Sequence, residues 1–253
     1  MIKYYGQTDT GMCRRENEDA FAVRELSAQK NGTQTVLAVA CDGMGGAAGG
    51  EIASALATQV YCDHLDRHAF PTRAAVHRSA LSAANRAVRK RAAENGGALA
   101  GMGSTLVSAL ATEKSLLVLW VGDSRAYLYR DGLLMPLTRD HSYVRQMMDA
   151  GLMSAEEAKR SPHRNVITRA VGAHATVKGD VVRCSWRRGD RLLLCTDGLT
   201  GCVSEREICS ILEEGTSLFD MANELIVAAN CRGGEDNITA LLLENTKEIT
   251  PNA

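Results

Sequence analysis

The sequence is poor in aromatic residues and has no excess of charge of either sign. Phenylalanine, tryptophan and tyrosine together make up 4% of the 253 residues, so the core must consist mainly of alanine, valine, leucine and isoleucine. The 29 basic and 30 acidic residues nearly cancel, which argues against nucleic acid or a membrane surface as the main partner. No apolar run reaches the length of about 18 residues that a membrane-spanning helix needs.

The sequence also lacks paired cysteine motifs and an apolar leader. None of the eight cysteines belongs to a C-x-x-C pair, and several lie inside apolar runs. We therefore expect buried free thiols in a reducing compartment rather than disulfides or a zinc site. The first residues, MIKYYGQTDTG, contain no apolar signal core, so we expect a cytoplasmic protein.

The overall composition, with 45% hydrophobic and 23% charged residues, is typical of a globular protein. No repeat, linker or low-complexity stretch divides the chain. We therefore expect one domain over residues 1–245, followed by a short C-terminal tail, 246–253, that is free to fray.

The order of predicted elements indicates the fold class. Apolar and β-branched runs predict strands at residues 35–41, 104–111, 115–121, 125–130, 176–184, 191–196 and 238–244. Helical spacing and capping residues predict helices at 51–68, 71–95, 142–151, 154–160 and 217–229, and a short one after Ser204. This order is not a regular alternation of strand and helix, so it favours an α+β fold with antiparallel sheets.

Acidic residues recur at the ends of the predicted strands or beside glycine. The groups are Asn17-Glu18-Asp19, Asp42-Gly43, Gly122-Asp123-Ser124, Asp197-Gly198 and Glu235-Asp236-Asn237. A lone Asp-Gly pair is an ordinary turn, but five such groups together indicate a site. Carboxylates without histidine or cysteine partners suit hard cations such as Mg²⁺ or Mn²⁺. Two such ions can acidify a shared water and stabilise the oxygens of a phosphoryl displacement.

The sequence motifs around these acidic groups resemble those of a known family. In chain order the motifs are TDTGMCRRENED at 8–19, DGMGG at 42–46, GEIAS at 50–54, GMGSTL at 101–106, VGDSRAY at 121–127, LTRDHS at 137–142, NVITRAVG at 165–172, TDGL at 196–199 and DNIT at 236–239. They resemble the protein phosphatase 2C family, the metal-dependent PPM phosphatases, over almost the whole chain. The compact length and the DGMGG wording look like the bacterial branch. The resemblance implies a four-layer α/β/β/α sandwich of two antiparallel sheets flanked by helices.

The resemblance also implies roles for the acidic residues. It implies two Mn²⁺ or Mg²⁺ ions, with Asp42 bridging both and the carbonyl of Gly43 binding one of them. Asp197 and Asp236 are then expected to complete the shell of the other ion. Bacterial relatives often show a third metal ion, for which Asp123 with Asp197 is the matching pair.

Four further residues receive roles from the same resemblance. Glu18 and Asp19 are expected to act mainly through metal-bound waters. Arg14 is expected to grip the substrate phosphate, because a guanidinium fork matches two phosphate oxygens. Asn237 is expected to support the ligand residues without touching a metal ion.

Two positions depart from the family pattern. Eukaryotic members have histidine where Met44 stands, and bacterial members usually have histidine where Ala47 stands. Neither Met44 nor Ala47 can donate a proton to the leaving alkoxide, so the donor is a metal-bound water or His141. His141 opens the segment 141–165, which corresponds to the mobile flap beside the site. We favour the water.

These observations predict a monomeric enzyme that hydrolyses phosphoserine and phosphothreonine in proteins with a water bridging two cations, opposing a bacterial Hanks-type serine/threonine kinase. One alternative is a degenerate phosphatase that binds phosphoproteins without cleaving them. Such a protein should lack at least one of Asp42, Asp197 and Asp236, yet all three are present. Another alternative, chemistry through an aspartyl phosphate, needs an Asp-x-Asp motif that Asp42-Gly43-Met44 does not provide.

Overall fold

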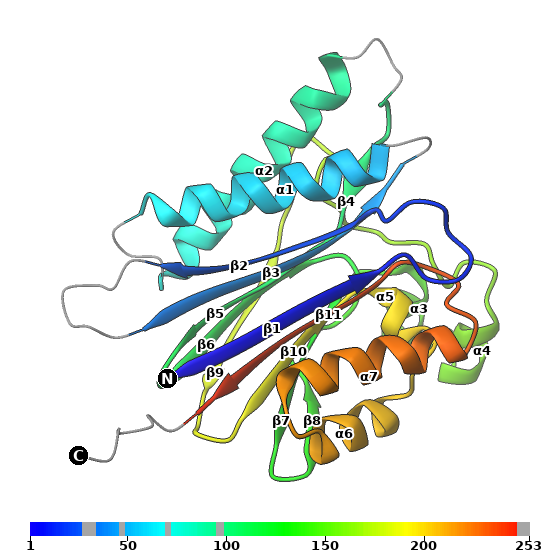
Figure 1. The fold of residues 1–253 in the computed structure, drawn as a ribbon. Coiled ribbons are helices and arrows are strands. Elements are labelled where there is room, and N and C mark those ends of the chain that lie inside the picture. The colour runs from blue at the N-terminus through cyan, green and yellow to red at the C-terminus, as the bar shows by residue number, and fades with distance from the viewer. Residues whose placement is uncertain (27–33, 46–48, 69–71, 95–98, 247–253) are drawn as a thin grey trace.

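The computed structural model describes residues 1–26, 34–45, 49–68, 72–94 and 99–246, and these build two β-sheets stacked face to face between helices (Figure 1). One sheet runs in the order β1 (Ile2–Asp9), β11 (Ile238–Asn245), β10 (Arg191–Cys195), β7 (Arg125–Arg130) and β8 (Leu133–Pro136). The other runs in the order β2 (Asp19–Leu26), β3 (Thr35–Met44), β5 (Leu106–Thr112), β6 (Ser115–Val121) and β9 (Asp180–Ser185), with β4 (Gly103–Ser104) paired to β3. The paired strands are antiparallel, which confirms the predicted α+β class.

Helices form the outer layers of the sandwich. The sheet containing β3 is covered by α1 (Gly49–Asp66) and α2 (Ala74–Glu94). The sheet containing β11 is covered by α6 (Glu205–Glu214) and α7 (Leu218–Cys231), with the short α5 (Asp197–Thr200) at its edge. In the described ranges no helix combines the length and apolar content that crossing a bilayer requires.

The alternation of side chains along the central strands explains the layers. In β3, Leu37, Val39 and Cys41 pack toward α1 and α2, whereas Val36, Ala38 and Ala40 pack between the two sheets. A strand that is buried on both faces needs apolar residues at every position, which is why the sequence TVLAVAC is continuous. In β10, Leu193 and Cys195 likewise belong to the layer under α6 and α7, while Leu192 and Leu194 belong to the layer between the sheets.

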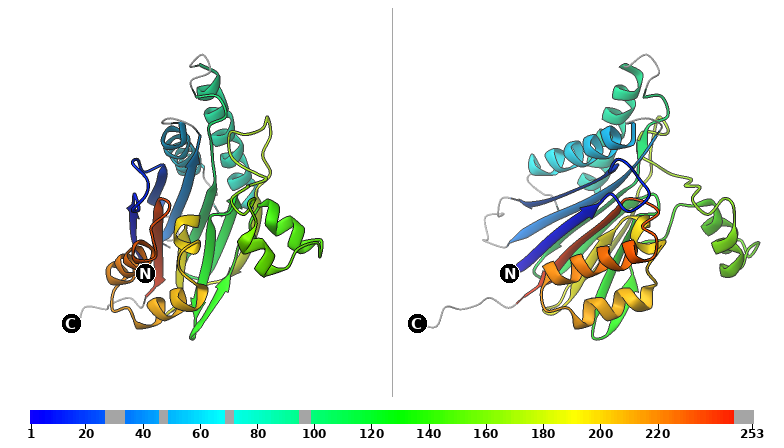
Figure 2. Two further views of the ribbon diagram at one scale, coloured as in Figure 1. Left: turned by 90° about the vertical axis from the view of Figure 1, so that its right-hand side faces the viewer. Right: turned by 45° about the vertical axis from the view of Figure 1, so that its right-hand side comes forward.

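A helical extension interrupts the second half of the chain. It contains α3 (Tyr143–Asp149) and α4 (Ala155–Arg160), and it projects from the sandwich rather than covering a sheet (Figure 2). The two ends of this extension are tied to each other. Ser142 and Ile167 form an isolated bridge, and the backbone N–H of Thr168 donates to the carbonyl of His141 over 2.7 Å. We refer to residues 141–165 as the flap.

The structure corrects several predicted boundaries. Strands β1, β2 and β8 were not predicted, and the strand expected at 176–184 spans only Asp180–Ser185. The run expected at 104–111 divides into β4 and β5, and Asp197 opens the short helix α5 instead of following a strand in a loop. The expected helix 71–95 is observed as Ala74–Glu94, with its predicted first and last residues outside the described ranges. Of the two departures from the family pattern, Met44 ends β3, whereas Ala47 lies outside the described ranges, as does most of the predicted tail.

Candidate active site

The acidic groups meet at one edge of the sandwich because antiparallel pairing alternates strand directions. The end of β3 lies beside the start of β2, so Asp42 and Asp19 are direct partners in the register. In the facing sheet the end of β10 lies beside the start of β11, which places Asp197 and Asp236 at the same edge. The turn between β6 and β7 adds Asp123. Residues that are far apart in the sequence thus form one carboxylate cluster: Asp19, Asp42, Asp123, Asp197 and Asp236.

Burial and mutual repulsion raise the pKa values of the aspartates in the carboxylate cluster. Loss of water on burial, together with the charges of Asp197, Asp19 and Asp123, raises the pKa of Asp42 well above its usual range. Burial, opposed by hydroxyl hydrogen bonds, raises the pKa of Asp19 to about 8, and burial with the charge of Asp197 raises the pKa of Asp123 to about 8. Burial and the charge of Asp236 also raise the pKa of Asp197. A cluster of this kind favours protons or cations over free negative charge.

Hydrogen bonds fix the backbone and side chains that carry the cluster. Asp19 Oδ2 accepts from the hydroxyls of Thr196 at 2.8 Å and Thr239 at 2.6 Å, while its Oδ1 is buried without a partner. The backbone N–H of Asp42 donates to Thr105 Oγ1 over 2.8 Å, and its carbonyl accepts from Ser104 Oγ over 2.9 Å. The end of β3 is therefore held in place from its β5 side.

Gly43 lies where two backbone segments approach closely. A Cβ at this position would overlap the carbonyl oxygen of Gly50 and would lie 2.5 Å from the carbonyl oxygen of Glu18. The N–H of Gly43 donates to that Glu18 carbonyl over 3.0 Å. Only glycine fits here, so Asp42 and the loop that carries Glu18 stay next to each other. Burial raises the pKa of the Glu18 carboxyl, although a backbone hydrogen bond from Gly50 opposes the shift.

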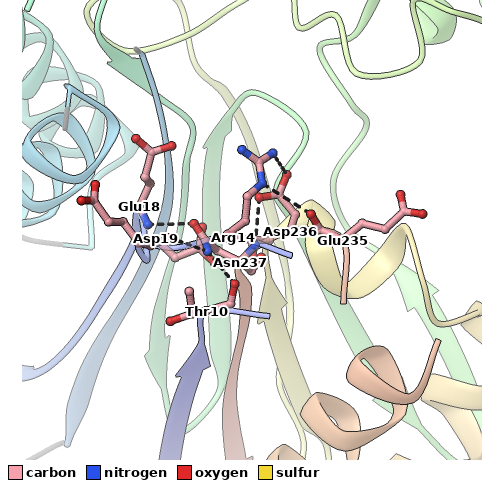
Figure 3. A network of polar contacts seen from close by, with 9 residues as sticks. Thr10, Arg14, Glu18, Asp19, Glu235, Asp236 and Asn237 are labelled. Carbon is pink, nitrogen blue, oxygen red and sulfur yellow. Dashed lines mark hydrogen bonds and ion pairs between the residues drawn. The ribbon is translucent and has the colours of Figure 1, made fainter. Parts of the chain in front are cut away.

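Asn237 connects the N-terminal loop to the start of β11 (Figure 3). Its amide nitrogen donates to the carbonyls of Thr10 and Glu16, both at 2.9 Å, and its Oδ1 accepts from the N–H of Glu18 at 2.8 Å. This places Arg14 next to Asp236, and the guanidinium donates to Asp236 Oδ2 over 2.7 Å. The predicted phosphate-binding residue and a predicted metal ligand are thus paired with each other.

The chemistry of the carboxylate cluster fits hard divalent cations. All its donors are oxygens, and one of them, Asp19 Oδ1, is buried and unpartnered. Within the described residues, however, no group of three or more Asp, Glu, His or Cys side chains is arranged so that it could hold a metal ion. Asp236 is turned to Arg14, and the charge of Asp197 helps to raise the pKa of Asp42. Binding of cations would offset the repulsion between these carboxylates and would replace the Arg14 contact.

His141 does not point a free nitrogen at the carboxylate cluster. Its ring is buried against Trp120, with 6.0 Å between the ring centroids, and its Nδ1 accepts from the N–H of Gly122 at 3.2 Å. Its Nε2 lies 3.3 Å from Asp180 and 3.1 Å from the guanidinium of Arg169. Burial lowers the pKa of His141 despite the carboxylate of Asp180. These contacts fix the root of the flap to β6 and β9.

Several residues near the cluster were not predicted as part of the site. Arg125 donates to both oxygens of Asp140, at 2.9 and 2.7 Å, and so brings a paired cation next to Asp123. Arg125 follows Asp123 in the same motif, which was the only signal in the sequence. A cavity of about 370 Å³ contains Arg14, Asp197 and Asp236, and it is also lined by Arg164 and Arg232. Nothing in the sequence places those two arginines beside the cluster.

Comparison with known proteins identifies the class. The sequence profile of the protein phosphatase 2C family matches residues 14–241, so this chain belongs to that family. It is 36% identical over 241 residues to the serine/threonine phosphatase stp of Listeria innocua, covering 94% of each chain. The resemblance drawn from the motifs is thereby confirmed.

Solved structures agree with this assignment. The serine/threonine phosphatase of S. agalactiae matches with a TM-score of 0.90 at 29% identity, covering 98% of this chain and 100% of the other. The catalytic domain of the serine/threonine protein phosphatase PstP, solved in complex with two manganese ions, matches with a TM-score of 0.84 at 32% identity, covering 97% and 99%. The expected face-to-face sandwich of the family is confirmed by these matches.

Proposed function

We propose that this protein hydrolyses phosphoserine and phosphothreonine in proteins and needs two bound Mn²⁺ or Mg²⁺ ions to do so. The observation that supports this most directly is the carboxylate cluster, in which acidic side chains from both sheets meet with too few cations to neutralise them. The naming of the relatives as serine/threonine phosphatases and the two manganese ions in the PstP structure support the same activity.

We assign the ligands as the sequence predicted them. Asp42 would hold both ions, the carbonyl of Gly43 would hold one, and Asp197 and Asp236 would hold the other. Glu18 and Asp19 would order water around them, and Asp123 would help to hold a third ion. Bound ions supply an acidified water and neutralise charge on the phosphate oxygens.

The protein side chains carry the remaining steps. Arg14 leaves Asp236 and binds two oxygens of the phosphate, because a phosphate dianion is a stronger acceptor for its fork than one carboxylate oxygen. Thr196 and Thr239 keep Asp19 oriented through their hydroxyl hydrogen bonds. Asn237 keeps the loop with Glu18 and Arg14 against β11. His141 holds the flap root and does not donate the proton to the leaving alkoxide.

The activity can be tested with peptides that carry one phosphoresidue. We expect release of phosphate from phosphothreonine and phosphoserine peptides in the presence of Mn²⁺, and much slower release by Asp197→Asn. A binding module without activity would instead retain the peptides in a pull-down assay without releasing phosphate. That outcome would support the alternative that the protein is a degenerate phosphatase, which binds phosphoproteins without cleaving them. The presence of Asp42, Asp197 and Asp236 argues against this alternative.

We also propose that the protein is a cytoplasmic monomer that opposes a Hanks-type serine/threonine kinase. The structure pairs none of the eight cysteines with another, as suits a reducing compartment. Phosphoproteomics of a deletion strain beside its parent tests the partner. We expect a set of phosphothreonine sites to rise, including sites on such a kinase, whereas unchanged kinase phosphorylation would contradict the pairing.

A further inference from the structure

A second cavity lies between the flap and the body of the protein, beside the one that contains Arg14. It has a volume of about 530 Å³. Its flap side includes Val144, Met148 and Ala158, and its body side includes Thr200 at the end of α5. We call this cavity the flap groove. Its volume is in the range of a ligand-binding site, and its lining mixes apolar and charged side chains.

The flap groove and the cavity with Arg14 share part of their walls. Arg164, Asn165, Asp197 and Gly201 line both of them. A polypeptide whose phosphoresidue lies against Arg14 can therefore extend into the flap groove past Arg164. Because extended chain advances about 3.3 to 3.6 Å per residue, the side chains that reach Arg164 are those within about three residues of the phosphoresidue.

Arg164 differs from the other cations of the flap groove in that its side chain has no partner within the described part of the chain. Arg145 lies 3.1 Å from Asp149, Lys159 lies 3.5 Å from Glu156, and Arg125 is paired with Asp140. Among the residues that the structure describes, the guanidinium of Arg164 makes neither an ion pair nor a side-chain hydrogen bond. It is exposed at the junction of the two cavities, with its donors available to a ligand.

The acidic residues of the flap groove do not cancel this charge. Asp123 and Asp197 belong to the carboxylate cluster, whose charge the proposed cations neutralise. Asp140 is already held by both donors of Arg125. The free charge that the flap groove presents to a peptide is therefore the positive charge of Arg164.

We propose that the flap groove binds the residues next to the phosphoserine or phosphothreonine, and that Arg164 selects substrates with an anionic side chain within about three residues of it. The inference rests on the proposed phosphatase function and adds its substrate class. The anionic group is a carboxylate or a second phosphate, because a guanidinium fork accepts either. The apolar side chains of the flap contact the remainder of the peptide.

The test uses phosphothreonine peptides with a single glutamate placed at each position from three before to three after the phosphoresidue, beside a glutamine series. We expect kcat/KM to be higher for glutamate at one or two positions by about tenfold, the scale of a charge-assisted contact reduced by exposure. A matching series with a non-hydrolysable phosphonate in place of glutamate separates carboxylate from phosphate recognition. The preference should shrink as salt is raised, because both groups are exposed.

Two variants decide whether Arg164 is responsible. Arg164→Ala should remove the glutamate preference and Arg164→Lys should retain part of it. Arg160→Ala is the matched control, because Arg160 is an exposed flap cation that lines neither cavity. Equal rates for the glutamate and glutamine peptides in the parent protein would overturn the inference while leaving the phosphatase function intact. Equal loss of preference in both alanine variants would also overturn it, since general flap charge would then suffice. Failure to hydrolyse any peptide would instead contradict the proposed function.

Discussion

The guanidinium of Arg14 donates to the carboxylate of Asp236 over 2.7 Å, so the predicted phosphate-binding group and a predicted metal ligand neutralise each other. The side chains of this pair are 50% and 36% exposed. An ion pair this exposed is worth on the order of 1 kcal/mol or less, so it is easily exchanged. Asp236 can then turn to a cation and Arg14 to a phosphate.

This exchange of partners predicts that loss of Arg14 weakens substrate binding without weakening activation by metal. Arg14→Ala should raise KM for a phosphothreonine peptide by about 10- to 100-fold, the scale of lost charge-assisted hydrogen bonds. It should not raise the Mn²⁺ concentration for half-maximal activity, because Asp236 loses a competitor. Steady-state kinetics at varied peptide and varied Mn²⁺ measure both quantities. A variant with unchanged KM and weaker metal activation would show that Arg14 serves the metal site.

Asp123 is predicted to serve a third ion only. Asp123→Ala should lower turnover of phosphopeptides by about 10- to 100-fold, which is typical of losing a supporting group near a metal. Titration calorimetry should still find two tightly bound Mn²⁺ ions. Loss of both tight sites in this variant would place Asp123 in the two-ion core instead.

The raised carboxyl pKa values predict how stability depends on pH when metal is absent. Asp19 and Asp123 have pKa values of about 8 in the folded protein, against about 4 for aspartate in an unfolded chain. The folded state therefore binds more protons, so stability is fully present below pH 4 and is lost as pH rises toward 8. The melting temperature of chelator-treated protein should fall between pH 5 and pH 8. Added Mn²⁺ should reverse most of this fall, and a melting temperature that rises over the same pH range would contradict the prediction.

The contacts of His141 predict that it is not the proton donor to the leaving group. Nitrophenyl phosphate barely needs such a donor, whereas a phosphothreonine peptide does. Because His141 holds the flap root through Gly122, Asp180 and Arg169, His141→Ala should change the rates for both substrates by similar factors. A loss of about 100-fold or more confined to the peptide, the scale of a removed general acid, would make His141 the donor.

The sequence was informative where local pattern and burial coincide. The continuous apolar run that became β3 was predicted because both faces of that strand are covered. The helix expected at 154–160 is present as α4, and the capping residues that indicated it, Ser154 and Glu157, form a capping box at its start. By contrast, β1 and β2 are only partly buried and carry polar residues, so their composition gave no strand signal.

The acidic residues of the site and Arg14 were predictable from the sequence, but the other cations around it were not. The carboxylates stand beside glycine or at strand ends, which is visible along the chain. Arg164 comes to the cluster only through the position of the flap against the sandwich, and Arg232 through the C-terminal end of α7. Those positions depend on tertiary packing, so a single sequence without its fold could not reveal them.

The central claim is that divalent cations held by the carboxylate cluster are required for hydrolysis. The most direct measurement is turnover of a phosphothreonine peptide by chelator-stripped protein, before and after Mn²⁺ is added back, with Asp42→Asn assayed in parallel. We expect no turnover after stripping, recovery with Mn²⁺ in the parent protein, and a loss of about 100-fold or more in the folded Asp42→Asn variant at saturating Mn²⁺. Full turnover in excess chelator, or near-parental turnover by Asp42→Asn, would contradict the account.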